Sequence, residues 1–488
     1  MIGAITSKLN TFLRSDSLRG KIIQGGGVLA LGSFTDNLLR FVRNMILARL
    51  LAPDAFGLMA TIIATVAAAE AFAEVGLTQS IIQNKRGGDK EFLNIIWWLA
   101  SLRATVLYMV AYFATPFISN FLNIPESTTI MRTAFTVILF RGFTSPNIYL
   151  LQKELRFTKW VLLTQSASCI GVLVAIVSVF YIRNVWALVL GYISEAFLIF
   201  AFSYIFCPLI PRFTFNPSHA REIIGFSKKV FGLPILMVLY YQADNFVIGK
   251  VLSIETLGLY FLARNLAEMP NTIFAKISPV FLPAFSLMQD DKVKLKNTLL
   301  KFTEIVATFG LPFFIFFIVF SRPILSLIYS PTYSAVAIPF SIFSIFVFLY
   351  LLSALIMNVV FATGHPDIHR TASMVRTISF LALLYPATKY FGLIGASSTA
   401  LLSMGLCIAI QMHYLKKLLK MNITEYLTNF TKGIKYSLIV LIPGILFSAF
   451  ISLQQLCAVG IGAFLCVIAW CIGIAGIIRQ KNELPQLS

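Results

Sequence analysis

Ionisable side chains inside long apolar stretches are the residues of this sequence best placed to do chemistry. The stretch from 22 to 50 holds Asp36, Arg40 and Arg43 at positions i, i+4 and i+7, so their side chains share one stripe of a helix. Each such group costs about 2.5–3.5 kcal/mol in lipid unless it has a partner or a wet cavity. A self-neutralising Asp36–Arg40 pair would only orient the helix, and it leaves Arg43 without a local partner. The pattern favours a helix face that lines a hydrated cavity.

Carboxylates in two other stretches are candidates for ion coupling. Glu70 and Glu74 have i, i+4 spacing, and two carboxylates this close repel each other when both are ionised. One of them is therefore expected to take up a proton or a cation. The alternative is that Glu74 forms an ion pair with an arginine on a neighbouring helix. A later stripe holds Tyr260, Arg264 and Glu268 at i, i+4 and i+8. For this stripe an intrahelical salt bridge and a substrate or ion role are equally good interpretations.

The deepest charges indicate an anionic substrate. Most of the deep cations are arginines of the first half of the chain, and a guanidinium binds phosphate in bidentate fashion and stays charged. We therefore predict a phosphorylated substrate rather than a cationic one. The candidate substrate-binding cations are Arg40, Arg43, Arg103, Arg141 and Arg264. The candidate ion-coupling groups are Glu70, Glu74, Asp36, Glu268 and Asp244.

Composition shows which elements must position these groups. Of 488 residues, 58% are hydrophobic and 12% are charged, about half the charge of a typical soluble chain. A helix needs about 20 apolar residues to cross the hydrocarbon core. We predict an all-α integral membrane protein of about 14 transmembrane helices, with a further short helix possible in 321–334. The predicted spans are 22–50, 56–83, 92–118, 127–151, 159–181, 185–209, 222–249, 255–286, 298–320, 334–362, 366–388, 391–415, 431–451 and 455–478.

The distribution of lysine and arginine orients these spans. With both termini in the cytoplasm, inner loops and tails hold 27 of the 39 Lys and Arg residues, and outer loops hold five. This asymmetry is what the positive-inside rule requires. The net charge of +19 therefore reports topology and contact with anionic lipid, and no nucleic-acid partner is needed to explain it. We expect a multi-pass protein of the bacterial inner membrane with both termini in the cytoplasm.

An internal repeat divides the chain. Residues 43–58 (RNMILARLLAPDAFGL) align without a gap with residues 244–259 (DNFVIGKVLSIETLGL), an offset of 201 residues. In both copies a long apolar helix ends in a cation, and an acidic turn and a glycine follow. The offset maps the first span onto the seventh, so two pseudo-symmetric six-helix lobes are expected, related by an axis along the membrane normal. The predicted parts are an N-lobe (1–209), a C-lobe (210–415) and a basic linker with two trailing helices (416–488).

The sequence shows no feature of an enzyme. It contains no phosphate-binding loop, nucleotide-binding domain or catalytic triad, and its cysteines and histidines have no metal-ligand pattern. Two side-by-side helical repeats are the usual organisation of a secondary transporter. We expect no cofactor and no metal site, with a proton or sodium gradient as the driving force.

Three segments resemble a known family. They are FAEVGLTQSIIQNK (72–85), LLQKELRFTKW (150–160) and LGLYFLARNLAEMPNTIFAKISPVFLPAFSLMQDD (257–291). They resemble the polysaccharide transporter branch of the multidrug/oligosaccharidyl-lipid/polysaccharide exporter superfamily, and within it the Wzx-type O-antigen and colanic-acid flippases. The resemblance implies two lobes around a cavity that opens alternately to either face.

The resemblance also implies a substrate and a role. The substrate would be an undecaprenyl-pyrophosphate-linked oligosaccharide, moved from the cytoplasmic to the periplasmic leaflet with proton or sodium coupling and passed to a polysaccharide polymerase. Tyr240, Tyr241 and Tyr260 are the aromatic residues we would place against sugar. The alternatives are a cation-coupled drug exporter and a peptidoglycan-precursor flippase of the same superfamily. A membrane-embedded glycosyltransferase or polymerase would need a large extramembrane loop with paired acids, which this sequence lacks.

Overall fold

The protein is an all-helical membrane protein in two compact units. The computed structural model describes residues 18–72, 77–84, 86–212, 233–278, 281–450 and 455–483, and every regular element in these ranges is a helix. Eight of the described helices are long and apolar enough to cross a membrane. The all-α multi-pass prediction is thereby confirmed, with fourteen an approximate count. The units comprise residues 1–250 and 251–488, and the lobe boundary at 209/210 stays a prediction.

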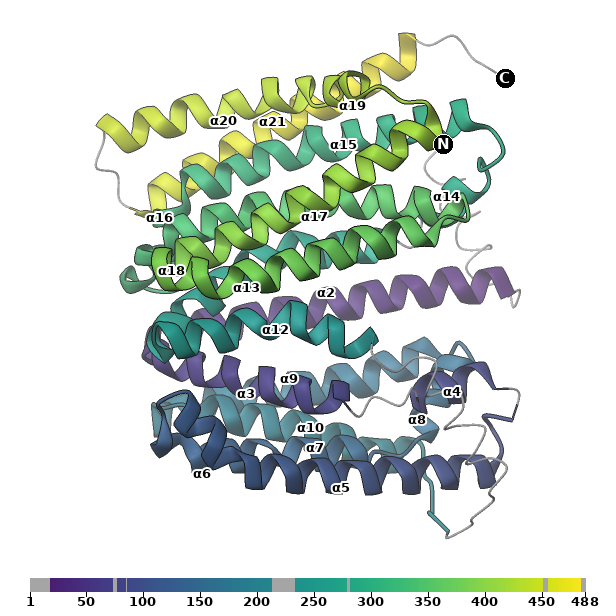
Figure 1. Cartoon of the computed structure of the whole chain (residues 1–488), viewed down its shortest axis with the longest axis vertical. Coiled ribbons are helices and arrows are strands. Elements are labelled where there is room, and N and C mark those ends of the chain that lie inside the picture. The colour runs from purple at the N-terminus through teal and green to yellow at the C-terminus, as the bar shows by residue number, and fades with distance from the viewer. Residues whose placement is uncertain are drawn as a thin grey trace, which may run out of the picture. The chain divides into compact units, whose positions relative to one another are not determined.

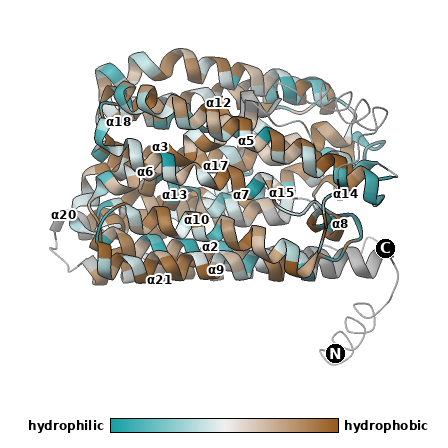
Figure 2. Cartoon of the chain, turned by 90° about the horizontal axis from the view of Figure 1, so that it is seen from below, coloured by the Kyte–Doolittle hydropathy of each residue, from teal (hydrophilic) through white to brown (hydrophobic). Residues whose placement is uncertain are grey.

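Unit 1 is built from long apolar helices and several short ones, and Figure 2 shows apolar residues along most of the long ones. Within this unit α9 packs against both α10 and α2, and α5 packs against α7. The described helices of unit 1 (Figure 1) are α2 (Leu18–Leu50), α3 (Pro53–Phe72), α4 (Leu77–Gln83), α5 (Lys90–Phe121), η1 (Pro125–Ser127), α6 (Thr128–Ala134), α7 (Thr136–Gly142), α8 (Asn147–Lys153), α9 (Phe157–Ile182), α10 (Trp186–Phe206) and α12 (Leu233–Val251).

Glycines set the close approach of α9 and α10. A β-carbon added at Gly171 would lie 2.8 Å from Cβ of Glu195, and one added at Gly191 would lie 2.7 Å from Cβ of Ala175. Small residues at such interfaces let helix backbones approach closely in a membrane, where no hydrophobic driving force acts between helices. The contact brings the carboxylate-bearing face of α10 onto α9.

Unit 2 is organised around α15, which packs against α17, α20 and α21. Two ion pairs add to these contacts: Lys296 to Glu425 at 2.9 Å and Lys432 to Glu304 at 2.6 Å. The described helices of unit 2 are α13 (Ile254–Ile277), α14 (Phe281–Ser286), α15 (Lys292–Val319), α16 (Ser321–Ile328), η3 (Pro331–Val336), α17 (Ala337–Ala362), α18 (Pro366–Leu419), α19 (Ile423–Thr428), α20 (Thr431–Phe450) and α21 (Gln455–Glu483).

One predicted span is not a single helix, and one helix contains two predicted spans. The predicted span 127–151 is divided among α6, α7 and α8. The break between α7 and α8 is explained by Pro146, which precedes α8 and cannot continue α7. The predicted second span contains α3 and α4, and residues 73–76 between them lie outside the described residues. The segment α18 is interrupted at Gly392, whose φ is 59°. The chain turns back at this glycine, because Arg376 before it and Met404 after it are in contact, with Nη1 of Arg376 4.0 Å from Sδ of Met404. A short helix, α16, occupies part of 321–334 as anticipated.

The internal repeat is visible in the helix ends. α2 ends at Leu50 and α3 begins at Pro53, while α12 ends at Val251 and α13 begins at Ile254. Both ends are thus displaced by the 201 residues that relate the sequences. Each first helix carries a basic residue in its last turn, and each second helix carries an acidic residue in its first turn. These charges complement the helix dipoles at both breaks.

Candidate functional site: a cavity in unit 1

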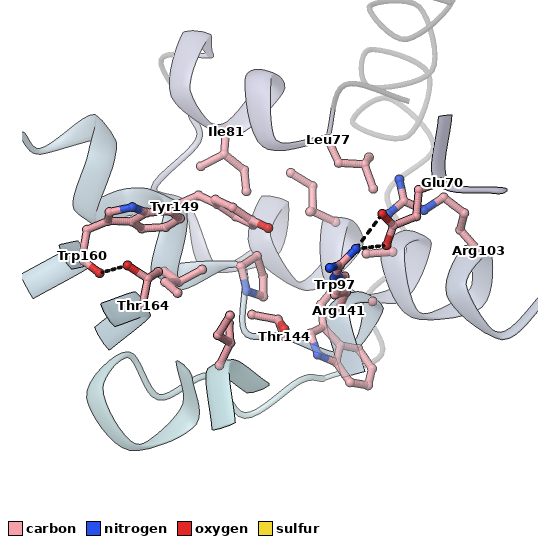
Figure 3. Close-up of a pocket in the computed structure, with 16 residues that line it drawn as sticks. Glu70, Leu77, Ile81, Trp97, Arg103, Arg141, Thr144, Tyr149, Trp160 and Thr164 are labelled. Atoms are coloured by element: carbon pink, nitrogen blue, oxygen red, sulfur yellow. Dashed lines mark hydrogen bonds and ion pairs between the residues drawn. The ribbon is translucent and has the colours of Figure 1, made fainter. Parts of the chain in front are cut away.

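A cavity of about 350 Å³ lies within unit 1 (Figure 3). Its walls come from α3, α4, α5, α7, α8, α9 and α10, so helices far apart in the sequence meet around it. The charged and aromatic side chains that line it are Glu70, Arg103, Arg141, Trp97, Tyr149 and Trp160. It combines a charged end with an aromatic wall.

The charged end is centred on an ion pair between α3 and α7. Nη1 of Arg141 donates to both carboxylate oxygens of Glu70, at 2.8 and 3.1 Å, and Nη2 donates to the Tyr192 hydroxyl at 3.3 Å. The side chains of Arg141 and Glu70 are 46% and 34% exposed, so the pair is open to the cavity. Arg103 lines the same space, and the three formal charges sum to +1. An anionic group is therefore favoured over a cation here.

Close packing of α5 and α7 places the two arginines in one wall. A β-carbon at Gly142 would lie 2.0 Å from Cβ of Ala104, so only glycine fits at this contact. Arg141 precedes Gly142 and Arg103 precedes Ala104 in the chain. The same contact between small residues thus brings both guanidinium groups to the cavity. The residues after Gly142 turn toward Pro146, which ends α7 and lets α8 close the far wall.

The aromatic wall was not predicted from the sequence. Tyr149 of α8 and Trp160 of α9 have ring centroids 6.0 Å apart, and both side chains are half-buried. These two residues form the aromatic wall. Trp97 of α5 also lines the cavity, and it is held in place by its indole N–H, which donates to the Tyr204 hydroxyl at 2.7 Å. That hydroxyl donates in turn to the carbonyl of Phe143 at 2.8 Å. The signal available in the sequence was the presence of Trp160 in the segment 150–160.

The predicted stripe on α2 forms a second charged cluster in unit 1. Nε of Arg40 lies 3.0 Å from Asp36, which gives the local pair, and Nη2 of Arg40 lies 2.5 Å from Glu195 of α10. The hydroxyl of Ser168 donates to Asp36 and accepts from Arg40 at 3.4 Å. Arg43 instead donates to the side-chain oxygen of Asn44 at 3.0 and 3.2 Å. Glu195, which is 155 residues away from Arg40 in the chain, thus belongs to this cluster.

The remaining candidates lie elsewhere. In α12 Asp244 and Tyr240 are buried, whereas Tyr241 is partly exposed. In unit 2, Arg264 pairs with Glu268 at 3.0 Å, which is the intrahelical salt bridge that the spacing allowed. Glu74 lies outside the described residues.

Tyr260 of α13 is buried. Its side chain is 2% exposed and its ring packs against Phe343 at 6.2 Å between centroids. The interpretation of Tyr260 as a residue that contacts sugar stays a prediction. The guanidinium of Arg264 also lies over the Phe343 ring, 5.3 Å from its centroid.

Comparison with known proteins identifies the family. Residues 46–338, more than half of the chain, match the sequence profile of the family described as "Polysaccharide biosynthesis protein". The chain belongs to this family. It is 25% identical over 394 residues to the lipopolysaccharide biosynthesis protein WzxC of Escherichia coli strain K12, covering 78% of each chain. It is 22% identical over 275 residues to the succinoglycan biosynthesis transport protein ExoT of Rhizobium meliloti strain 1021, covering 56% of each. The Wzx-type resemblance seen in the sequence is thereby confirmed.

Solved structures agree with the fold. The lipid II flippase MurJ in an inward closed conformation superposes with a TM-score of 0.71 at 17% identity, over 92% of this chain and 99% of MurJ. An inward-facing multidrug transporter of the MATE family superposes with a TM-score of 0.58 at 14% identity, over 80% and 99%. At these identities the likeness concerns the fold, which is that of a membrane transporter.

Proposed function

We propose that the protein is a flippase for oligosaccharides linked to undecaprenyl pyrophosphate, working from the cytoplasmic to the periplasmic leaflet of the bacterial inner membrane. The observation that carries the proposal is the arginine-containing cavity inside a unit of apolar helices. Membership of the polysaccharide biosynthesis family supports it. In this role the protein is a transporter rather than an enzyme, and its product passes to a polymerase outside.

The physical task explains the composition of the cavity. A lipid-linked glycan moved without help would carry hydroxyls and a pyrophosphate through hydrocarbon, where each unsatisfied polar group costs several kcal/mol. Arg103 and Arg141 offer the planar donors that match phosphate oxygens. The prenyl tail remains in lipid while the charged and hydroxylated parts travel in the protein interior.

The Glu70–Arg141 pair supplies a coupling mechanism. In the structure Glu70 forms an ion pair with Arg141. A pyrophosphate that binds Arg141 on the cytoplasmic side displaces Glu70 from it. An inward proton or sodium gradient drives export only by exchange, so the ion must occupy Glu70 on the return step, when Arg141 holds no substrate. In this scheme the gradient drives net outward movement, with Glu70 rather than Asp36 or Glu268 as the leading carboxylate.

Two alternatives from the same superfamily are weighed against this proposal. A cation-coupled drug exporter would need an acidic cavity, whereas the charges here sum to +1. A peptidoglycan-precursor flippase shares the pyrophosphate carrier, and the fold of MurJ keeps it as the second candidate. The sugar attached to the pyrophosphate is what separates these two flippases.

The test uses purified protein in proteoliposomes and a fluorescent farnesyl-pyrophosphoryl oligosaccharide, whose movement is followed by quenching with impermeant dithionite. An imposed proton or sodium gradient should accelerate movement several-fold. Arg141→Ala should abolish movement and Arg141→Lys should restore part of it, because charge survives while the bidentate fork is lost. Glu70→Gln should bind substrate but lose the acceleration.

Arg132→Ala is the matched control. Arg132 stacks on Tyr112, 4.3 Å from the ring centroid, and does not line the cavity. This variant should move substrate at the wild-type rate. Wild-type rates in Arg141→Ala would contradict the assignment of the cavity, and equal rates with and without every gradient would contradict coupling.

A further inference from the structure

We propose that the aromatic wall formed by Tyr149 and Trp160 binds the sugar ring directly attached to the pyrophosphate, and so reads the first sugar of the glycan. The inference rests on the proposed function, since a lipid-linked glycan is the ligand in both. The two side chains line the same cavity as Arg103 and Arg141. A ligand that spans both ends of the cavity must therefore carry an anionic group beside a ring that stacks on aromatic side chains.

The order of the two ends along the helices matches the order of groups in such a lipid. α5 begins at Lys90 and α9 begins at Phe157, both at the side that the charge distribution predicts to be cytoplasmic. At 1.5 Å per residue, Arg103 is about 20 Å into α5, whereas Trp160 is about 5 Å into α9. The arginines thus lie deeper than the aromatic wall. A pyrophosphate held at depth, with its tail leaving sideways into lipid, directs its sugar back toward the cytoplasm and onto the wall.

The chemistry of the wall suits a pyranose. One face of such a ring is apolar and stacks on aromatic rings, while its hydroxyls need donors and acceptors. Figure 3 shows the Tyr149 ring beside Trp160 with its hydroxyl directed away toward the middle of the cavity. Thr164 lines the same end, and its hydroxyl donates to the Trp160 carbonyl at 3.0 Å, so its oxygen can still accept. An apolar pocket for a prenyl tail would not need these two hydroxyls.

The size of the cavity limits how much of the glycan it can recognise. Its volume of about 350 Å³ is near the lower end of the range of about 300–1,000 Å³ for small-molecule pockets. That is room for a pyrophosphate and a single sugar ring rather than a whole repeat unit. We therefore expect selectivity for the first sugar and tolerance of the sugars beyond it.

The experiment compares binding of sugar-free and sugar-bearing probes to the detergent-solubilised full chain. The probes are farnesyl pyrophosphate and farnesyl pyrophosphate carrying one glucose, galactose or N-acetylhexosamine. Wild type should bind at least one sugar-bearing probe about tenfold more tightly than farnesyl pyrophosphate. Trp160→Leu and Tyr149→Leu should reduce this preference to less than threefold while affinity for farnesyl pyrophosphate stays within twofold.

Two further variants sharpen the result. Trp98→Leu is the matched control, because Trp98 neighbours Trp97 on α5 but does not line the cavity, and it should keep the full preference. Tyr149→Phe keeps the ring, removes only the hydroxyl and should lose part of the preference, which covers the case in which a leucine variant fails to fold.

The outcomes separate this inference from the proposed function. Equal affinity of wild type for all probes, with farnesyl pyrophosphate still bound through Arg141, would overturn the sugar subsite and leave the flippase proposal standing. Loss of preference in Trp98→Leu as large as in Trp160→Leu would also overturn it. Absence of farnesyl pyrophosphate binding, together with normal transport by Arg141→Ala, would instead contradict the proposed function.

Discussion

Replacing Arg40 with methionine removes the cation that Asp36 and Glu195 both contact. Removing one partner of a buried ion pair costs about 3–5 kcal/mol, because the remaining charge stays desolvated. Here the side chains of Arg40, Asp36 and Glu195 are 36%, 25% and 17% exposed, so water screens part of that cost. We expect a loss of about 2 kcal/mol. For a unit of about 250 residues the entropy of melting is about 0.5 kcal/mol/K, which converts this loss into a fall in Tm of about 4 °C.

A double-mutant cycle measures whether the cluster acts as predicted. Glu195→Gln keeps the shape and removes one of two anions that share a cation, so its own effect on Tm should stay within about 1 °C. In the Glu195→Gln background, Arg40→Met should cost about half as much, since only Asp36 is then left without its cation. The corresponding coupling energy is about 1 kcal/mol. Thermal unfolding in detergent, followed by intrinsic fluorescence, gives all four Tm values. An Arg40→Met protein that melts with the wild type, or an effect of Arg40→Met that is unchanged by Glu195→Gln, would refute the reasoning.

Two more predictions concern packing and topology. Gly171→Val should lower stability by about 1–3 kcal/mol, because a β-carbon there would lie within 3 Å of atoms of α10; thermal melting measures the loss, and an unchanged Tm would show that α9 and α10 can separate without cost. Cysteines placed at Ser218 and Ser488 should escape impermeant maleimide in intact cells, since the charge asymmetry puts both positions in the cytoplasm; labelling of both from outside would reverse the topology.

Periodicity and composition alone determined the class of the protein and much of its local structure. Spacing of i, i+4 is a property of one helix, so the Asp36–Arg40 and Arg264–Glu268 pairs were visible in the sequence and are present in the structure. The repeat at an offset of 201 residues correctly marked where two pairs of helices break. Apolar length likewise predicted a multi-pass protein, because crossing a bilayer needs a minimum number of apolar residues.

Tertiary structure decided which charges meet across helices. Glu70 is paired with Arg141 of α7, and Glu195 joins Arg40 of α2, although neither pairing follows from any spacing along the chain. The aromatic wall formed by Tyr149 and Trp160 was equally invisible, because these residues come from separate helices joined by a turn. Contacts of this kind depend on where small residues let helices approach and on how each helix is rotated about its axis. A membrane sequence thus predicts the depth of each charge, whereas packing between helices selects its partner.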